Sequence, residues 1–135
     1  MPTASDVSRL LRLKFEFNDF SDFVPHIRNG FPRECFDDFV SETNIATAIT
    51  RLSAFRDLSD DSMRLTSEAS DCLLRVARIY AEAFDLFGVS SDVASWMQTE
   101  SQTLGDETPL ELLDTSVGFE LVFHELKRLQ YGIAG

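Results

Sequence analysis

The sequence predicts an all-α protein, folded as a compact helical domain. Three observations support this prediction. Apolar residues recur at three- and four-residue intervals, most clearly from Leu65 to Phe87, as in a helix that buries one face. Helix-capping residues and helix-ending glycines separate such stretches. The chain has 135 residues, 44% of them hydrophobic and 12 of them Phe, so it can bury a sizeable core.

The N-terminal residues carry weaker patterns. Residues 1–8 are expected to be frayed. From Leu11 to Phe17 apolar and polar residues alternate, which is typical of a short edge strand or of an extended arm used in self-association. A helix stays open there because the flanking chain is helical. Residues 19–28 form a short aromatic segment with one apolar helical face, and Pro25 limits its regularity.

Residues 32–64 have the outline of a helix-turn-helix. Pro32 is expected to open one helix, and Thr43 or Asn44 to cap a second. The polar stretch 55–64 would be the third element, which in such motifs lies in the DNA major groove.

Three arginines in or near this third element are the candidate DNA contacts, namely Arg51, Arg56 and Arg64. Three carboxylates accompany them and would repel phosphates, namely Asp57, Asp60 and Asp61. Direct DNA binding and a role as a scaffold or dimerisation module therefore both stay open.

The C-terminal half has clearer boundaries. Thr66 suits the N-cap of the long helix that ends at Phe87, and Gly88 suits its termination. Ser90 or Ser91 is expected to cap the next helix, which runs to about residue 98.

Residues 104–115, which we call the corner, are the most specific run in the chain. Gly105 suits a turn with positive φ, and Thr108, Pro109 and Glu111 suit the capping box of a short helix. Thr115 or Ser116 is then expected to cap a last helix, so the corner would set the direction of that helix. The last helix should run to about Gln130 and bury Val122, Leu126 and Leu129, with Phe119 and Leu121 widening its apolar face.

The charge of the chain is strongly negative and uneven. The formal net charge is −11, of which −3 falls within residues 1–64 and −8 within residues 65–135. Such a balance argues against a general nucleic-acid or anionic-membrane binder and favours a basic protein partner. Cys35 and Cys72 lie among apolar residues, which fits a reducing cytosol, and no secretory signal or membrane span is expected. We therefore expect a cytoplasmic protein.

No enzyme template fits the sequence. His124 and Glu125 begin like a zinc-peptidase motif, but Arg128 stands where a second histidine is required. We therefore expect no catalytic residues, no metal and no cofactor. A surface role falls on the segment 127–135, which holds the only basic pair in an acidic half and ends in small residues with one aromatic, Tyr131. Such a chain end can enter a concave pocket, the alternative being a frayed terminus.

The segment from Leu65 to Gly135 resembles the toxin-binding domain of the Xre/MbcA/ParS antitoxins. The combination of a tryptophan, a Leu-Gly turn and a Thr-Pro-Leu-Glu-Leu-Leu run in this order makes the resemblance specific. The matching positions are Leu65-Thr66, residues 74–79, Ala83-Phe84, Phe87-Gly88, Ala94, Trp96-Met97, Leu104-Gly105, residues 108–115, Gly118, Val122, Leu126 and Gly132.

The resemblance implies a non-enzymatic antitoxin of a type II toxin–antitoxin system, whose partner is a RES-domain toxin that consumes NAD. Residues 1–64 would be an Xre-like helix-turn-helix and dimerisation region that can repress the operon as a homodimer, although residues 57–64 depart from the family pattern. Residues 65–135 would bind the toxin. In the family the C-terminal segment blocks the entrance of the NAD pocket, which here implies Lys127, Arg128, Gln130, Tyr131, Gly132 and Ile133. The alternatives are a DNA-binding regulator without a toxin and a general protein-interaction module.

Overall fold

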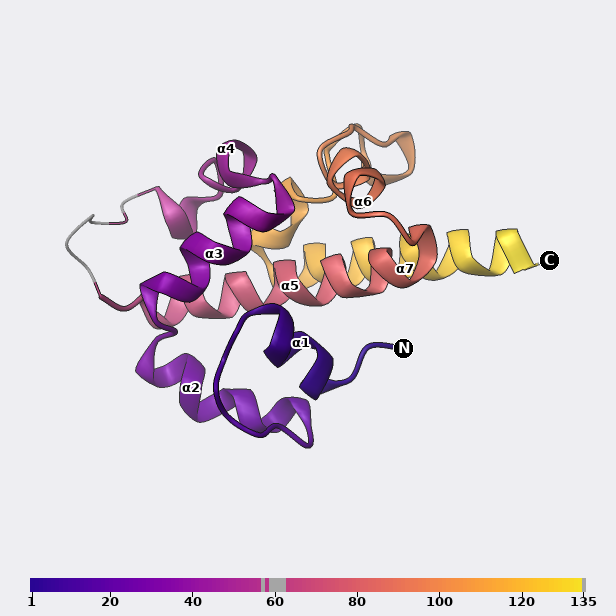
Figure 1. Ribbon diagram of the computed structural model, residues 1–135. Coiled ribbons are helices and arrows are strands. Elements are labelled where there is room, and N and C mark those ends of the chain that lie inside the picture. The colour runs from indigo at the N-terminus through magenta and orange to yellow at the C-terminus, as the bar shows by residue number, and fades with distance from the viewer. Residues whose placement is uncertain (57, 59–62, 135) are drawn as a thin grey trace.

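The computed structural model describes residues 1–56, 58 and 63–134, and within these it confirms the all-α prediction. Strands are absent from this part of the chain, which contains only two isolated β-bridges. Figure 1 shows the arrangement of the helices. The α-helices are α1 (Ala4–Leu10), α2 (Phe23–Asn29), α3 (Arg33–Thr43), α4 (Ala46–Ile49), α5 (Ser67–Phe87), α6 (Ser90–Met97) and α7 (Ser116–Ala134), and the 3₁₀ helices are η1 (Phe20–Asp22), η2 (Ser53–Phe55), η3 (Gln102–Leu104) and η4 (Glu111–Asp114).

Helix α5 lies at the centre of the molecule. Its predicted ends are confirmed: the Thr66 hydroxyl accepts a hydrogen bond from the Ala69 amide at 3.0 Å, and Gly88 ends the helix with φ 76°. Helices α1, α2, α6 and α7 all contact it (Figure 1). Helix α6 begins at Ser90 without a side-chain cap, so the predicted serine cap is wrong. Among the described residues, no helix is both long and apolar enough to cross a membrane.

The structure differs from the expectations for residues 4–8, which are not frayed, and for residues 11–17, which form neither a strand nor a helix. Residues 4–10 form helix α1. A capping box between Thr3 and Asp6 starts this helix, and its Ala4 and Val7 are buried.

The alternating stretch is neither a strand nor an arm. It is an irregular segment in which Leu13 and Phe17 are buried whereas Phe15 is 56% exposed. Phe17 stacks on Phe23 with ring centroids 4.3 Å apart. Leu11, Leu13 and Phe17 therefore pack into the core, whereas Phe15 does not follow the alternation.

The helix-turn-helix outline is only partly present. Helix α3 begins after Pro32 as expected, but α4 has only 4 residues and no side-chain cap. Thr43 lies inside α3, and Asn44 ends that helix with φ 58°, so neither caps the second helix. Of the expected third element, residues 55–64, Phe55 is the last residue of η2 and Arg64 forms an isolated bridge with Pro32. Residues 57 and 59–62, with all three carboxylates, lie outside the described residues.

The N-terminal half joins the start of α5 through a close backbone contact at Gly30. This buried residue has φ 87°, and a Cβ there would overlap the carbonyl oxygen of Leu65. The Ser70 hydroxyl accepts a hydrogen bond from the Phe31 amide at 2.8 Å, and the Leu65 amide donates to the Phe31 carbonyl at 2.9 Å. Buried residues from both halves belong to one hydrophobic cluster.

The corner has most of its predicted chemistry. Gly105 has φ 70°, and the Thr108 hydroxyl accepts a hydrogen bond from the Glu111 amide at 3.1 Å. Pro109, however, lies in a turn before η4 instead of opening a helix. The Thr115 hydroxyl accepts from the Gly118 amide at 2.9 Å and thereby caps α7. The corner thus connects α6 to α7 through two capped turns.

Candidate functional site

Helix α7 carries the segment that the sequence singled out. It runs beside α5 and extends past the end of that helix (Figure 1). The helix continues to Ala134, so residues 131–134 are its last turn and the predicted end near Gln130 is wrong. Helix propagation explains the difference, because each residue added to an existing helix gains a backbone hydrogen bond. Val122 and Leu126 are fully buried, as predicted.

Lys127 points toward α5. Its Nζ lies 3.2 Å from Oε2 of Glu82 and 3.2 Å from Oε1 of Gln130, and 5.0 Å from the centre of the Phe123 ring. The Lys127 side chain is only 20% exposed and that of Glu82 only 8%. Lys127 therefore joins α7 to α5, and the half-buried Gln130 is its partner on the same helix.

Arg128 and Tyr131 face solvent instead. The Arg128 guanidinium donates two hydrogen bonds to the Glu125 carboxylate, at 3.0 and 2.6 Å. This pairing lowers the pKa of Glu125 and raises that of Arg128, because it favours the charged form of both groups. Tyr131 is 75% exposed, and Gly132 is exposed with open space around it. The Ile133 side chain lies outside the described residues.

A row of exposed residues on α7, which includes Arg128 and Tyr131, was not predicted from the sequence. Its members are spaced alternately by four and three positions, namely Val117, Leu121, His124, Arg128 and Tyr131. This spacing is the 3.5-residue period with which one helix packs against another. Val117 is 65% exposed and Leu121 51%, so the prediction that Leu121 widens the buried face is wrong. We call these five residues the α7 row.

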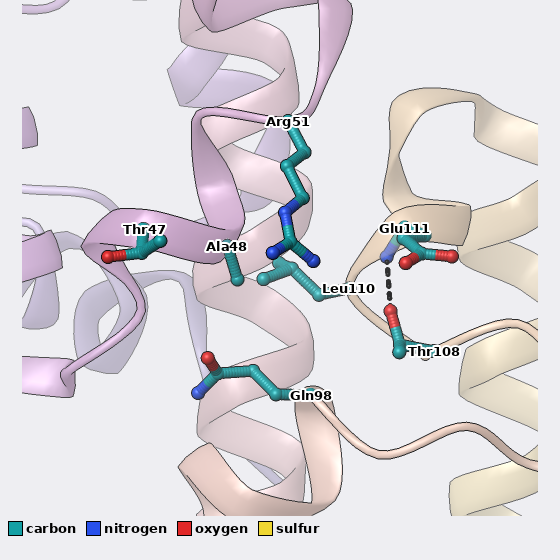
Figure 2. Close-up of a pocket in the computed structure, with 7 residues that line it drawn as sticks. All are labelled: Thr47, Ala48, Arg51, Gln98, Thr108, Leu110 and Glu111. Carbon is teal, nitrogen blue, oxygen red and sulfur yellow. Dashed lines mark hydrogen bonds between the residues drawn. The ribbon is translucent and has the colours of Figure 1, made fainter.

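The three candidate DNA-contacting arginines lie in different surroundings. Arg51 lines a small pocket beside the corner, and Figure 2 shows its side chain extending alongside Leu110. Thr47, Ala48, Gln98, Thr108 and Glu111 complete this pocket. Arg56 follows η2 and is exposed, whereas Arg64 donates a hydrogen bond from Nη1 to the Gly30 carbonyl at 2.7 Å. Arg64 thus contributes to the joint between the two halves.

Two observations on the described residues concern metal binding and thiol chemistry. No group of three or more His, Cys, Asp or Glu side chains in residues 1–56, 58 and 63–134 is placed to hold a metal ion. Burial raises the pKa of Cys72 to about 11, and its Sγ lies 3.5 Å from the Leu113 carbonyl oxygen. Such a thiol is a poor nucleophile.

Comparison with known proteins places the chain among antitoxins. Residues 82–132 match the family model of the antitoxin Xre/MbcA/ParS C-terminal toxin-binding domain, a span that includes Glu82, Lys127 and the α7 row. An antitoxin Xre of Yersinia enterocolitica is 36% identical over 118 residues, covering 82% of this chain and 79% of that protein. An antitoxin Xre of Photorhabdus laumondii is 34% identical over 71 residues, covering 52% of this chain and 48% of that protein. The chain therefore belongs to the Xre antitoxin family.

Proposed function

We propose that this chain neutralises a cognate toxin by binding it with the exposed end of α7. The observation that carries the proposal is the exposure of Tyr131 and Arg128 at the end of a helix inside the matched toxin-binding span. An exposed aromatic and an arginine are the residue types that most often dominate binding energy in protein interfaces. Val117 and Leu121 extend the same row with apolar surface.

The proposed partner is a RES-domain toxin that consumes NAD, and the proposed mechanism is occlusion of its active-site entrance. A toxin that binds the phosphates of a dinucleotide needs a basic pocket, and this chain carries a net charge of −11. The occluding element would be a helix end that presents Tyr131, Gly132 and their neighbours, because residues 116–134 are helical. A helix with its side chains is about 10 Å wide, so it would cover an entrance without entering deeply.

We expect Tyr131→Ala to weaken binding of the co-encoded toxin about tenfold or more, because the substitution removes the largest exposed side chain of the proposed contact. Deletion of residues 130–135 should abolish protection of cells that express the toxin. Calorimetry with purified toxin measures the change in affinity, and growth of cells after toxin induction measures the loss of protection. Phe15→Ala is the matched control, since Phe15 is also an exposed aromatic residue but precedes α2.

The toxin's NAD consumption separates occlusion from other modes of neutralisation. A complex at saturating antitoxin should leave NAD intact, and the truncated chain should not protect it. If the truncated chain binds the toxin and blocks NAD consumption as well as the full chain does, the proposed role of the helix end is wrong.

Four further features stay predictions within this proposal: homodimer formation, operator binding, a cytoplasmic site of action, and the division into residues 1–64 and 65–135. Operator binding through the exposed Arg51 and Arg56 predicts that Arg56→Glu removes a gel shift on the chain's own upstream DNA. The same variant should bind toxin normally. A gel shift that survives this charge reversal would contradict the assignment of Arg56. If the parent chain shifts the DNA but does not bind any toxin, a DNA-binding regulator is favoured instead.

A further inference from the structure

Three charged side chains lie in a row between α5 and α7. Arg78 and Glu82 are one helical turn apart on α5, and Lys127 of α7 reaches Glu82 at 3.2 Å. Glu82 is a nearly buried carboxylate, so it needs partners to stay charged at this position. We call Arg78, Glu82 and Lys127 the charge row.

Aromatic rings cover both cations of the charge row. The Arg78 guanidinium carbon lies 4.2 Å from the centre of the Phe20 ring and 4.9 Å from that of Phe119. Burial lowers the pKa of Arg78, while the nearby Glu82 carboxylate opposes this shift. Lys127 lies over the Phe123 ring. The rings of Phe119 and Phe123 come from α7, whereas Phe20 comes from η1 in the N-terminal half.

Lys127, the member of the charge row on α7, lies close to the proposed toxin contact. Lys127 precedes Tyr131 by one helical turn and is adjacent to Arg128 in the chain. A fixed point one turn before a helix end restrains where that end points, because the helix between them is rigid. Neither Arg78 nor Glu82 lies in the exposed α7 row.

We propose that Arg78, Glu82 and Lys127 are positioning residues that fix the direction of the last turn of α7 and so present Arg128 and Tyr131 to the toxin. The N-terminal half takes part in this positioning through the Phe20 ring. It thereby has a role in toxin recognition that does not depend on DNA binding. The inference rests on the proposed function for its toxin-related part. Its structural part can be tested on the free protein.

The first experiment measures amide hydrogen exchange of residues 128–132 in the free full-length protein. Glu82→Gln should speed this exchange about tenfold, because the last turn opens more often once Lys127 loses its carboxylate partner. Asp85→Asn is the matched control: Asp85 lies on the same helix, but its carboxylate is exposed and contacts only the N-terminal amine at 3.9 Å among its described ion pairs. Unchanged exchange in a folded Glu82→Gln protein would overturn the proposal.

A second variant keeps this experiment decisive should Glu82→Gln unfold. The double substitution Glu82→Met and Lys127→Met removes both charges and retains packing volume, an exchange that folded proteins often tolerate. It should give the same faster exchange of residues 128–132. Lys127→Arg retains the positive charge and should keep the exchange slow.

The second experiment measures coupling to the toxin contact. Glu82→Gln should weaken toxin binding about tenfold, and Tyr131→Ala should cause a smaller further loss in that background than in the parent chain. Additive losses would mean that Glu82 contributes stability without positioning Tyr131, and would overturn the toxin-related part. If the parent chain does not bind the toxin at all, the proposed function fails, whereas the exchange experiment still decides whether the charge row positions the helix end.

Discussion

Replacing Gly118 with alanine is expected to lower the free energy of unfolding by about 3 kcal/mol or more, the upper range for overpacking a buried site. Gly118 lies in the first turn of α7, where a Cβ would overlap the carbonyl oxygen of Leu112 and approach its carbonyl carbon to 2.7 Å. Both atoms belong to the backbone, so the clash is relieved only by moving α7 away from η4. Urea unfolding followed by circular dichroism measures the loss.

The same helix offers a control for this prediction. A Cβ at Gly132 meets no atom within 4 Å, so Gly132→Ala should stabilise the protein by a few tenths up to about 1 kcal/mol through helix propensity alone. The two substitutions are chemically identical and should have opposite signs. Equal effects at both positions would show that the contact between Gly118 and Leu112 does not limit the packing of α7.

Arg75→Met is expected to cost about 2–3 kcal/mol, because it removes a charged donor from a backbone carbonyl that has little access to water. Nε of Arg75 donates to the Leu113 carbonyl at 2.8 Å, and Nη2 donates to the Asp114 carbonyl at 3.3 Å. The half-buried Arg75 side chain therefore holds the end of η4, from which α7 starts. Thermal and urea unfolding measure the loss, and toxin affinity should fall in the same variant because α7 is displaced.

Arg9→Met is the matched control for Arg75. Each arginine pairs with an aspartate on its own helix, Arg75 with Asp71 at 2.6 Å and Arg9 with Asp6 at 2.5 Å. The Arg9 pair is exposed and joins no second element. Its loss should change stability by less than about 1 kcal/mol. A comparable loss in both variants would contradict the view that the carbonyls of η4 are what Arg75 stabilises.

Local chemistry allowed the corner and the ends of α5 to be predicted from the sequence. Thr66, Gly88, Gly105 and Thr115 act through their own backbone geometry or through a hydroxyl that reaches an amide three residues ahead. Such short-range contacts are visible in a residue pattern. The same reasoning failed for residues 11–17, because Leu11, Leu13 and Phe17 pack into the core instead of belonging to a strand.

The candidate site was less predictable, since the decisive contacts join distant parts of the chain. The resemblance implies that Lys127 contacts the toxin, and the structure adds a contact with Glu82, 45 residues away on α5. The α7 row was missed because its members share the helix with a stronger buried stripe and include His124 and Arg128, which are not apolar. The residues that a helix exposes can be identified only once its buried face is known.

The two native thiols are both buried, so a cysteine introduced at the exposed end of α7 can be labelled selectively. Cys35 and Cys72 are both buried, with raised pKa values, and at about 11 Cys72 is ionised in only about one molecule in ten thousand at neutral pH. A cysteine introduced by Tyr131→Cys would therefore react first with a maleimide dye. A fluorescent reporter can be attached beside the proposed contact in this way, without removing either native cysteine from the core.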